Sequence, residues 1–276
     1  MREYEITETV GDFKMACEIH SAVLASIPTI NQAKLSQFGS IARRLSKLLE
    51  PIVLSRLSIP DGFTFEIKIS KQIRGTPSGR MRLQWDELLE TRHFSVYVFI
   101  EENTFRHVFS ENKSTWIPNL VQSLCSTLVH ELVHLQQFAS LTKSLIARGY
   151  DERKYLDISD KIRDDAYLDR PIEAQAFGVE DATRIFFKIA TNEHTPEQIL
   201  ELLKQVRQDI PRAYRARGNS LFAKWPDYID PHGAFEDNPY MDRSNKRGGS
   251  LSEQARRIYL KTFVKTLDRI IAENNV

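Results

Sequence analysis

The chain has 276 residues, of which 41% are hydrophobic and 27% are charged, and its net charge is +1. A chain of this size and composition can bury a sizeable core, and its small net charge gives no general attraction to nucleic acid or to a membrane surface. The amino terminus shows no signal-like segment and the chain shows no long apolar run, so we expect a cytoplasmic protein that does not span a membrane. Two cysteines, Cys17 and Cys125, are too few for a disulfide framework, and we expect both to be free thiols.

The first part of the chain shows apolar residues at helical spacing. This pattern predicts helices over residues 12–26 and 31–50. Proline cannot donate the backbone hydrogen bond that continues a helix, so we expect Pro28 and Pro51 to end these two helices. Residues 1–58 then form a helical N-terminal segment.

Three strands are predicted next. Apolar and polar side chains alternate over residues 63–69 and 81–85, and the even positions of residues 94–100 are more apolar than the odd ones. Each pattern is typical of a half-buried strand.

A buried helix is predicted over residues 116–141. Its apolar side chains recur at helical spacing: Ile117, Leu120, Val121, Leu124, Leu128, Leu132 and Leu135. Within it, residues 130–134 read His-Glu-Leu-Val-His, the H-E-x-x-H pattern of zinc hydrolases. On a helix, His130 and His134 lie on one face a turn apart and can bind one metal ion. Two histidines at the margin of a core helix can also simply be satisfied by hydrogen bonds, but Glu131 in register favours a metal site, where its carboxylate would act as general base on a water molecule.

Catalytic zinc usually takes three protein ligands and keeps one position for water. Gln137 and Ser140 stand where a longer histidine-rich motif would have glycine and its third histidine, which excludes that arrangement. A second helix opens at Pro171, and its Glu173, 39 residues beyond His134 (173 minus 134), is our predicted third ligand. A carboxylate in the first turn of a helix is also favoured by the helix dipole alone.

Two further histidines are candidates for this role. His232, in a Pro-His-Gly turn, is the reserve candidate, and His194 precedes a helix that Thr195 caps. Further helices are predicted over residues 196–209, ending near Pro211, and over residues 252–272. The segments 142–166 and 215–250 receive no assigned role.

The H-E-L-V-H sequence with a later glutamate resembles the gluzincin branch of the zincin metallopeptidases. The spacing of Tyr167, Pro171, Glu173 and Ala176 is similar to the third-ligand segment of small members from bacteria and their phages. The resemblance covers about residues 60–190. It implies an α+β, zincin-like fold in which a small, mostly antiparallel sheet packs on the active-site helix, and its last or edge strand pairs with an extended peptide.

One position departs from that pattern. Phe177 stands where better-known gluzincins often carry an aspartate that braces a histidine. The candidates for that supporting role are Asp164, Asp165, Asp169 and Asp181.

The expected function is zinc-dependent hydrolysis of peptide bonds in a peptide or protein substrate. His130, His134 and Glu173 would hold Zn2+, and Glu131 would be the general base. Candidate donors to the oxyanion are Tyr167, Tyr228, Tyr240 and His232. We expect one metallopeptidase-like unit, with a zincin core over residues 59–190 and a helical C-terminal segment over residues 191–276.

Two other functions stay open. A metal-stabilised structural or interaction protein, for example of a phage, could keep a zincin core without turnover, and it would need a fourth protein ligand in place of water. A protease directed to DNA could use the basic clusters at residues 71–82 and 212–217, and its DNA binding would weaken steeply with salt.

Overall fold

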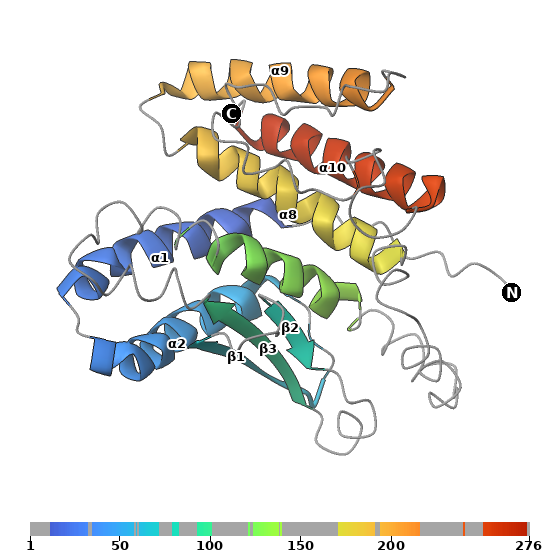
Figure 1. Ribbon diagram of the computed structural model, residues 1–276. Coiled ribbons are helices and arrows are strands. Elements are labelled where there is room, and N and C mark those ends of the chain that lie inside the picture. Colours follow the sequence, from blue (N-terminus) through green and yellow to red (C-terminus); the bar gives the residue numbers. More distant parts are fainter. Residues whose placement is uncertain are drawn as a thin grey trace, which may run out of the picture. The chain divides into compact units, whose positions relative to one another are not determined.

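The computed structural model describes the following residues: 12–32, 35–57, 59, 61–71, 79–82, 93–100, 121, 124–137, 139, 171–190, 194–215, 240 and 251–274. The chain divides into two compact units, one of residues 11–157 and one of residues 158–276 with 1–10 (Figure 1). The described residues form helices and a small sheet, which confirms the predicted α+β class. None of the described helices is long and apolar enough to cross a membrane.

The unit of residues 11–157 begins with helix α1 (Phe13–Gln32), a short 3-10 turn η1 (Leu35–Gln37) and helix α2 (Phe38–Arg56). The buried stripe of α2 repeats every four residues, at Ile41, Leu45, Leu49 and Val53. α2 packs against α1 and against the first strand of the sheet.

The expected ends of these helices are wrong, because Pro28 lies inside α1 and Pro51 inside α2. A proline frees the carbonyl four residues before it, here that of Leu24 or Lys47. Both prolines and both of these residues are exposed, so water can bond the freed carbonyls. Each proline also stands close to the end of its helix, where few further bonds are lost.

The sheet has the order β1-β3-β2, with β1 at Thr64–Lys71, β2 at Gly79–Arg82 and β3 at His93–Ile100. β1 and β3 run parallel over eight paired positions, whereas β2 pairs antiparallel with β3 over four. The expectation of a mostly antiparallel sheet is therefore wrong. The 21 residues between β1 and β3 (72 to 92) are long enough to return the chain to the starting edge, as parallel pairing requires. Alternation of side chains reports which face is buried and not the direction of the strand.

One face of the sheet is apolar and buried, and the other carries the polar side chains of β1 and β3 together with Tyr97 and Phe99. Every even position of β3 from Phe94 to Ile100 is buried, as predicted. On the opposite face, Glu66 accepts a hydrogen bond of 2.8 Å from Ser95 Oγ, lies 2.9 Å from His93 Nε2 and pairs with Lys68. Burial by itself raises the pKa of Glu66, but the hydrogen bonds from Lys68, His93 and Ser95 outweigh it and lower that pKa to about 2.

The helix that carries the H-E-x-x-H sequence is present, and residues 124–137 are helical as predicted (green ribbon in Figure 1). Within that range all residues are buried except Thr127 and Gln136, which are half-buried. No side of this helix is therefore fully exposed. Cys125 on this helix is a free thiol, as is Cys17, and burial raises the pKa of Cys125.

The unit of residues 158–276 contains three described long helices, α8 (Pro171–Ala190), α9 (Pro196–Arg215) and α10 (Glu253–Glu273). α9 continues through Pro211, which was wrongly expected to end it. Its start is as predicted: Thr195 Oγ1 accepts from Gln198 N at 3.3 Å, and Gln198 Oε1 accepts from Thr195 N at 2.8 Å. Ser252 caps α10 by accepting from Ala255 N at 3.2 Å.

α8 and α10 pack closely at Gly178. A Cβ atom added there would lie 2.8 Å from the carbonyl oxygen of Tyr259 and 3.1 Å from the backbone nitrogen of Phe263. Because both neighbours are backbone atoms of a helix, they cannot move aside without displacing that helix. Gly178 therefore sets the distance between the two helices.

Replacing Gly178 with alanine is expected to destabilise the protein by about 1–3 kcal/mol, through overpacking between α8 and α10. The matched control is Gly39→Ala in α2, where an added Cβ meets nothing within 4 Å and alanine is the better helix former. Urea unfolding followed by circular dichroism measures both variants. Equal stability of the two variants would contradict this account of the packing.

Glu66→Gln is expected to lower the melting temperature near pH 6 and to have a diminishing effect as the pH falls from about 4.5 towards 2. The folded-state pKa of Glu66 lies below its ordinary 4.5, so its contribution is present above 4.5 and disappears as the carboxylate is protonated. Glu18→Gln on α1, whose exposed carboxylate pairs with Arg56, is the comparison and should lower the melting temperature less. The measurement is the melting temperature of each protein between pH 3 and 7, and an effect of Glu66→Gln that stays constant with pH would refute the assignment.

Candidate metal centre

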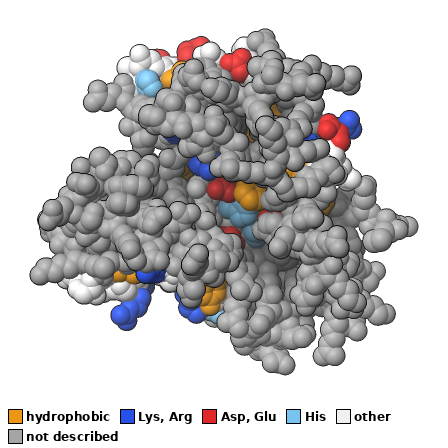
Figure 2. Space-filling model, viewed as in Figure 1, with side chains coloured by type: hydrophobic (Ala, Val, Ile, Leu, Met, Phe, Trp, Pro, Cys, Tyr) orange, Lys and Arg blue, Asp and Glu red, His pale blue; other side chains and the backbone are white. Residues whose placement is uncertain are grey.

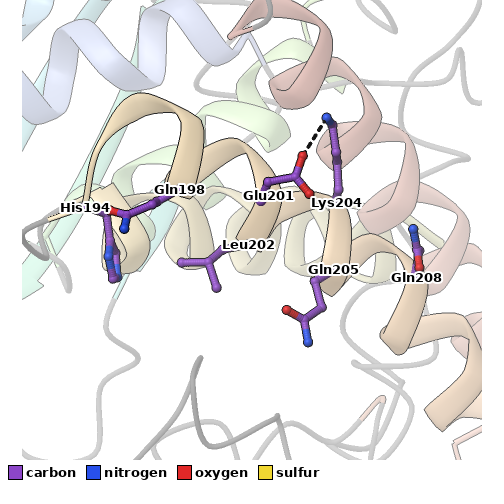
Figure 3. A pocket seen from close by; sticks show the side chains of 7 residues that line it. All are labelled: His194, Gln198, Glu201, Leu202, Lys204, Gln205 and Gln208. Atoms are coloured by element: carbon purple, nitrogen blue, oxygen red, sulfur yellow. Dashed lines mark hydrogen bonds and ion pairs between the residues drawn. The ribbon is translucent and has the colours of Figure 1, made fainter.

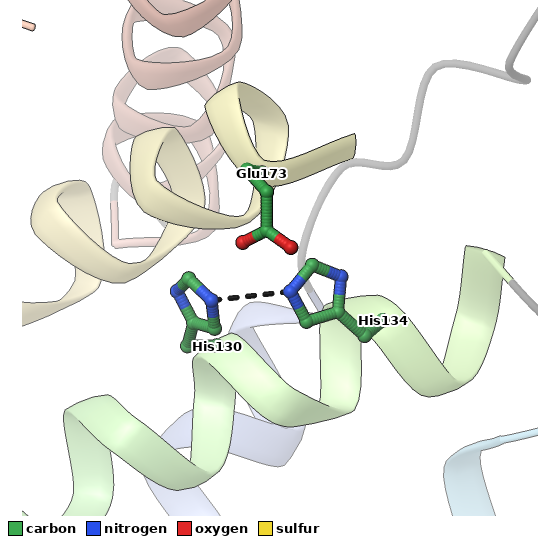
Figure 4. Close-up of side chains that lie close together, drawn as sticks. All are labelled: His130, His134 and Glu173. Atoms are coloured by element: carbon green, nitrogen blue, oxygen red, sulfur yellow. Dashed lines mark hydrogen bonds between the residues drawn. The ribbon is translucent and has the colours of Figure 1, made fainter. Parts of the chain in front are cut away.

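His130 and His134 face each other from consecutive turns of the helix of residues 124–137. Their Nε2 atoms lie 3.1 Å apart, and their rings are nearly perpendicular, at 79° (Figure 4). Two nitrogen ligands of a tetrahedral zinc ion, each ~2.0–2.1 Å from the metal, are separated by roughly 3.3 Å. The histidine pair therefore has a spacing that fits a shared metal ion to within a few tenths of an ångström.

Glu173 projects from the first turn of α8, as the sequence predicted. One potential ligand atom from each of His130, His134 and Glu173 lies within 4.8 Å of the others, and all three side chains are buried. In Figure 4 the carboxylate of Glu173 points toward the two imidazole rings. These are the three residues that the sequence proposed as ligands, and as a group they could hold a metal ion.

The burial of Glu173 separates it from an ordinary helix-start carboxylate. Glu197 occupies the corresponding first turn of α9 and is exposed, whereas Glu173 is 5% exposed. Hydrogen bonds to the backbone at the helix start and to Thr195 lower the pKa of Glu197, which is the behaviour expected where the helix dipole alone matters. That alternative explains Glu197 well but gives no reason to bury Glu173.

Glu131 lies on the same helix as the two histidines and is also buried, with 5% of its surface exposed. Its place in the chain, directly after His130, fixes its backbone relative to both imidazoles. Together the four side chains supply two imidazole rings and two carboxylates, and all four are buried.

Gln137 is a residue of this site that the sequence reasoning missed. Its Oε1 lies 2.9 Å from Nδ1 of His134, on the side of the ring away from His130, and its side chain is 9% exposed. In the sequence, Gln137 indicated only that the longer histidine-rich zinc motif, which has glycine at this position, is absent. The available signal was its position three residues after His134, a spacing at which helix side chains meet.

Two of the other candidate residues, Tyr240 and His194, lie in the described part of the chain. Tyr240 is fully buried, and its ring stacks on Tyr259 with centroids 4.8 Å apart. His194 is exposed at the start of α9. Tyr167, Tyr228 and His232 lie outside the described residues, as do residues 72–78 and 216–217 of the two basic clusters.

Of the four aspartates proposed as supports, Asp181 is the described one, and it serves the packing of α8 on α10. It accepts a hydrogen bond of 2.8 Å from the hydroxyl of Tyr259 and pairs with Arg184 at 2.5 Å. Asp164, Asp165 and Asp169 lie outside the described residues.

A hollow of about 500 Å³ lies elsewhere, along α9 (Figure 3). Its described lining comes from one stretch of chain, from His194 just before α9 to Gln208 within it, and is mostly polar. The ion pair between Glu201 and Lys204 forms part of this lining. The described lining shares no residue with the histidine pair.

The space-filling view shows histidine side chains beside acidic and hydrophobic ones near the middle of the drawn face (Figure 2).

Comparison of the chain with protein-family models, with curated proteins and with solved structures finds no match. The interpretation of the site therefore rests on its own residues and their geometry.

Proposed function

We propose that this chain is a zinc-dependent metallopeptidase of the gluzincin type, in which His130, His134 and Glu173 hold the metal ion. The observation that carries the proposal is the buried grouping of these three ligand atoms within 4.8 Å of one another. Glu131, in register on the same helix, supplies the general base. The metal, the reaction and the family assignment all belong to this proposal.

The residues fit a catalytic zinc in kind and in number. Two imidazole nitrogens and one carboxylate oxygen are a common ligand set for catalytic zinc, and three protein ligands leave one position for water. When bound, zinc supplies Lewis-acid activation of water and of the carbonyl oxygen of the substrate. A purely structural zinc would call for a fourth protein ligand and would have no use for Glu131.

The proton transfers fall to Glu131. Its carboxylate takes a proton from the attacking water and later delivers it to the leaving nitrogen, so that the C–N bond of the peptide breaks with release of a neutral amine and not of an amide anion. The buried position of Glu131 keeps bulk water from competing for that proton. His130, His134 and Glu173 stay in place throughout and act only as ligands.

The sheet limits where an extended peptide could add as a further strand. β3 was a candidate as the last strand in the chain, but it pairs with β1 on one side and β2 on the other. Among the described strands, the edges are β1 and β2. Pairing of a substrate with one of these two edges would agree with the zincin resemblance.

The purified full chain is expected to bind about one zinc ion, and His134→Ala or Glu173→Ala should weaken binding by at least about 100-fold, beyond the ~10–100-fold typical of supporting residues. Matched controls are His194→Ala, an exposed histidine, and Glu197→Ala, the exposed first-turn glutamate of α9. Competition with a chromogenic chelator measures the affinity. Full affinity in Glu173→Ala would remove the gluzincin assignment and make His232 the next ligand to test.

Glu131→Gln is expected to keep the zinc ion and to lose peptide hydrolysis by about 10²–10⁴-fold, because glutamine cannot accept the proton of the attacking water. Cleavage of a mixed peptide library is followed by mass spectrometry, with a chelator-treated sample as the baseline. Wild-type cleavage rates in Glu131→Gln would refute the mechanism. A wild-type protein that binds zinc and cleaves nothing would favour the non-catalytic alternative.

A further inference from the structure

The hydrogen bond between Gln137 and His134 determines which nitrogen of that histidine carries a proton. Oε1 of Gln137 lies 2.9 Å from Nδ1 of His134. The amide oxygen can only accept, so the hydrogen of this contact belongs to Nδ1 of the imidazole. A neutral imidazole with its proton on Nδ1 has a lone pair on Nε2.

That lone pair faces the interior of the candidate site. Nε2 of His134 lies 3.1 Å from Nε2 of His130, whose ring stands at 79° to it. A metal ion can bind a neutral imidazole only through the nitrogen without a proton. The tautomer set by Gln137 is therefore the one that leaves Nε2 of His134 available as a ligand.

We propose that Gln137 is a positioning residue that fixes the ring and the tautomer of His134 for zinc. The inference rests on the proposed function, since it assigns a support to one of its ligands. Gln137 and His134 belong to one helix and stand three residues apart, so the contact requires no other element of the fold. The ligand is thus oriented before any metal ion arrives.

A neutral support suits the charge of this site. Glu131 and Glu173 already place two carboxylates in buried positions. Aspartate or glutamate in the role of Gln137 would hold the same tautomer but would add a further buried negative charge. The amide oxygen supplies the acceptor without that cost.

Gln137→Met is expected to weaken zinc binding by about 10–100-fold, because methionine has a similar length and no strong acceptor. The matched control is Gln136→Met, the same change at a half-buried neighbour, which should leave the affinity within about 2-fold of the wild type. Gln137→Glu keeps the acceptor and should restore the affinity to at least the wild-type level. Each affinity is measured on the full chain with Zn2+ and a competing chelator, and circular dichroism verifies folding.

The 15N chemical shifts of His134 in the metal-free protein give a second measurement. If the role of Gln137 were only structural, its replacement would leave these shifts unchanged. The wild type and Gln137→Glu should carry the proton on Nδ1, and Gln137→Met should lose this preference. If Gln137→Met binds zinc as tightly as Gln136→Met, the inference is overturned while the zinc site stands. A drop of ten-fold or more in Gln137→Glu would mean that the amide donates to His134, which also overturns the inference.

Failure of the proposed function gives a different pattern. A wild type that binds no zinc removes the metal site, and the 15N shifts of His134 then decide the part played by Gln137. A proton on Nδ1 supports the role of Gln137 in fixing the ring, and a proton on Nε2 overturns it.

Discussion

Burial of polar side chains on a helix with no exposed residue is the constraint on which the site depends. His130, Glu131, His134 and Gln137 are all buried within residues 124–137. A buried polar group without a partner costs roughly 1–3 kcal/mol, so such a row persists only where its members satisfy one another or a ligand. The contacts from His134 to Gln137 and to His130 form a chain of polar groups along one face of the helix.

The same constraint on α8 is met in a different way. Asp181 is 2% exposed, and its two oxygens are satisfied by Tyr259 and Arg184, while Thr183 Oγ donates to the carbonyl of Val179 at 2.8 Å. These contacts stabilise the packing of α8 against α10, where Gly178 permits the close approach. Glu173 stands at the start of this helix, and under the proposed function the packed helix would hold it in the fixed geometry that a metal ligand requires.

The features that the sequence predicted correctly depend on spacing along the chain. The helix of residues 124–137, the buried even positions of β3 and the place of Glu173 in its first turn all follow from periods of 3.6 or 2 and from the residue types at helix starts. Pro28 and Pro51 were misjudged because the cost of a proline depends on whether water reaches the freed carbonyl. The direction of β3 could not be predicted either, since a parallel and an antiparallel strand bury the same alternate residues.

Gln137 was missed because its spacing of three residues from His134 indicates little until the side chains are placed. Its contact with His134 also offers a physical reason why position 177 carries phenylalanine in place of aspartate. The better-known gluzincins, which the sequence resembles, often carry an aspartate at that position to brace a histidine. Here Phe177 packs its ring 5.5 Å from that of Tyr240, which in turn stacks on Tyr259. If Gln137 supports His134 from its own helix, the third-ligand helix has no need of an aspartate there, and its position 177 can serve the aromatic packing that stabilises the unit. Under the proposed function, the support of the histidine and the packing of α8 are thus separated onto two helices.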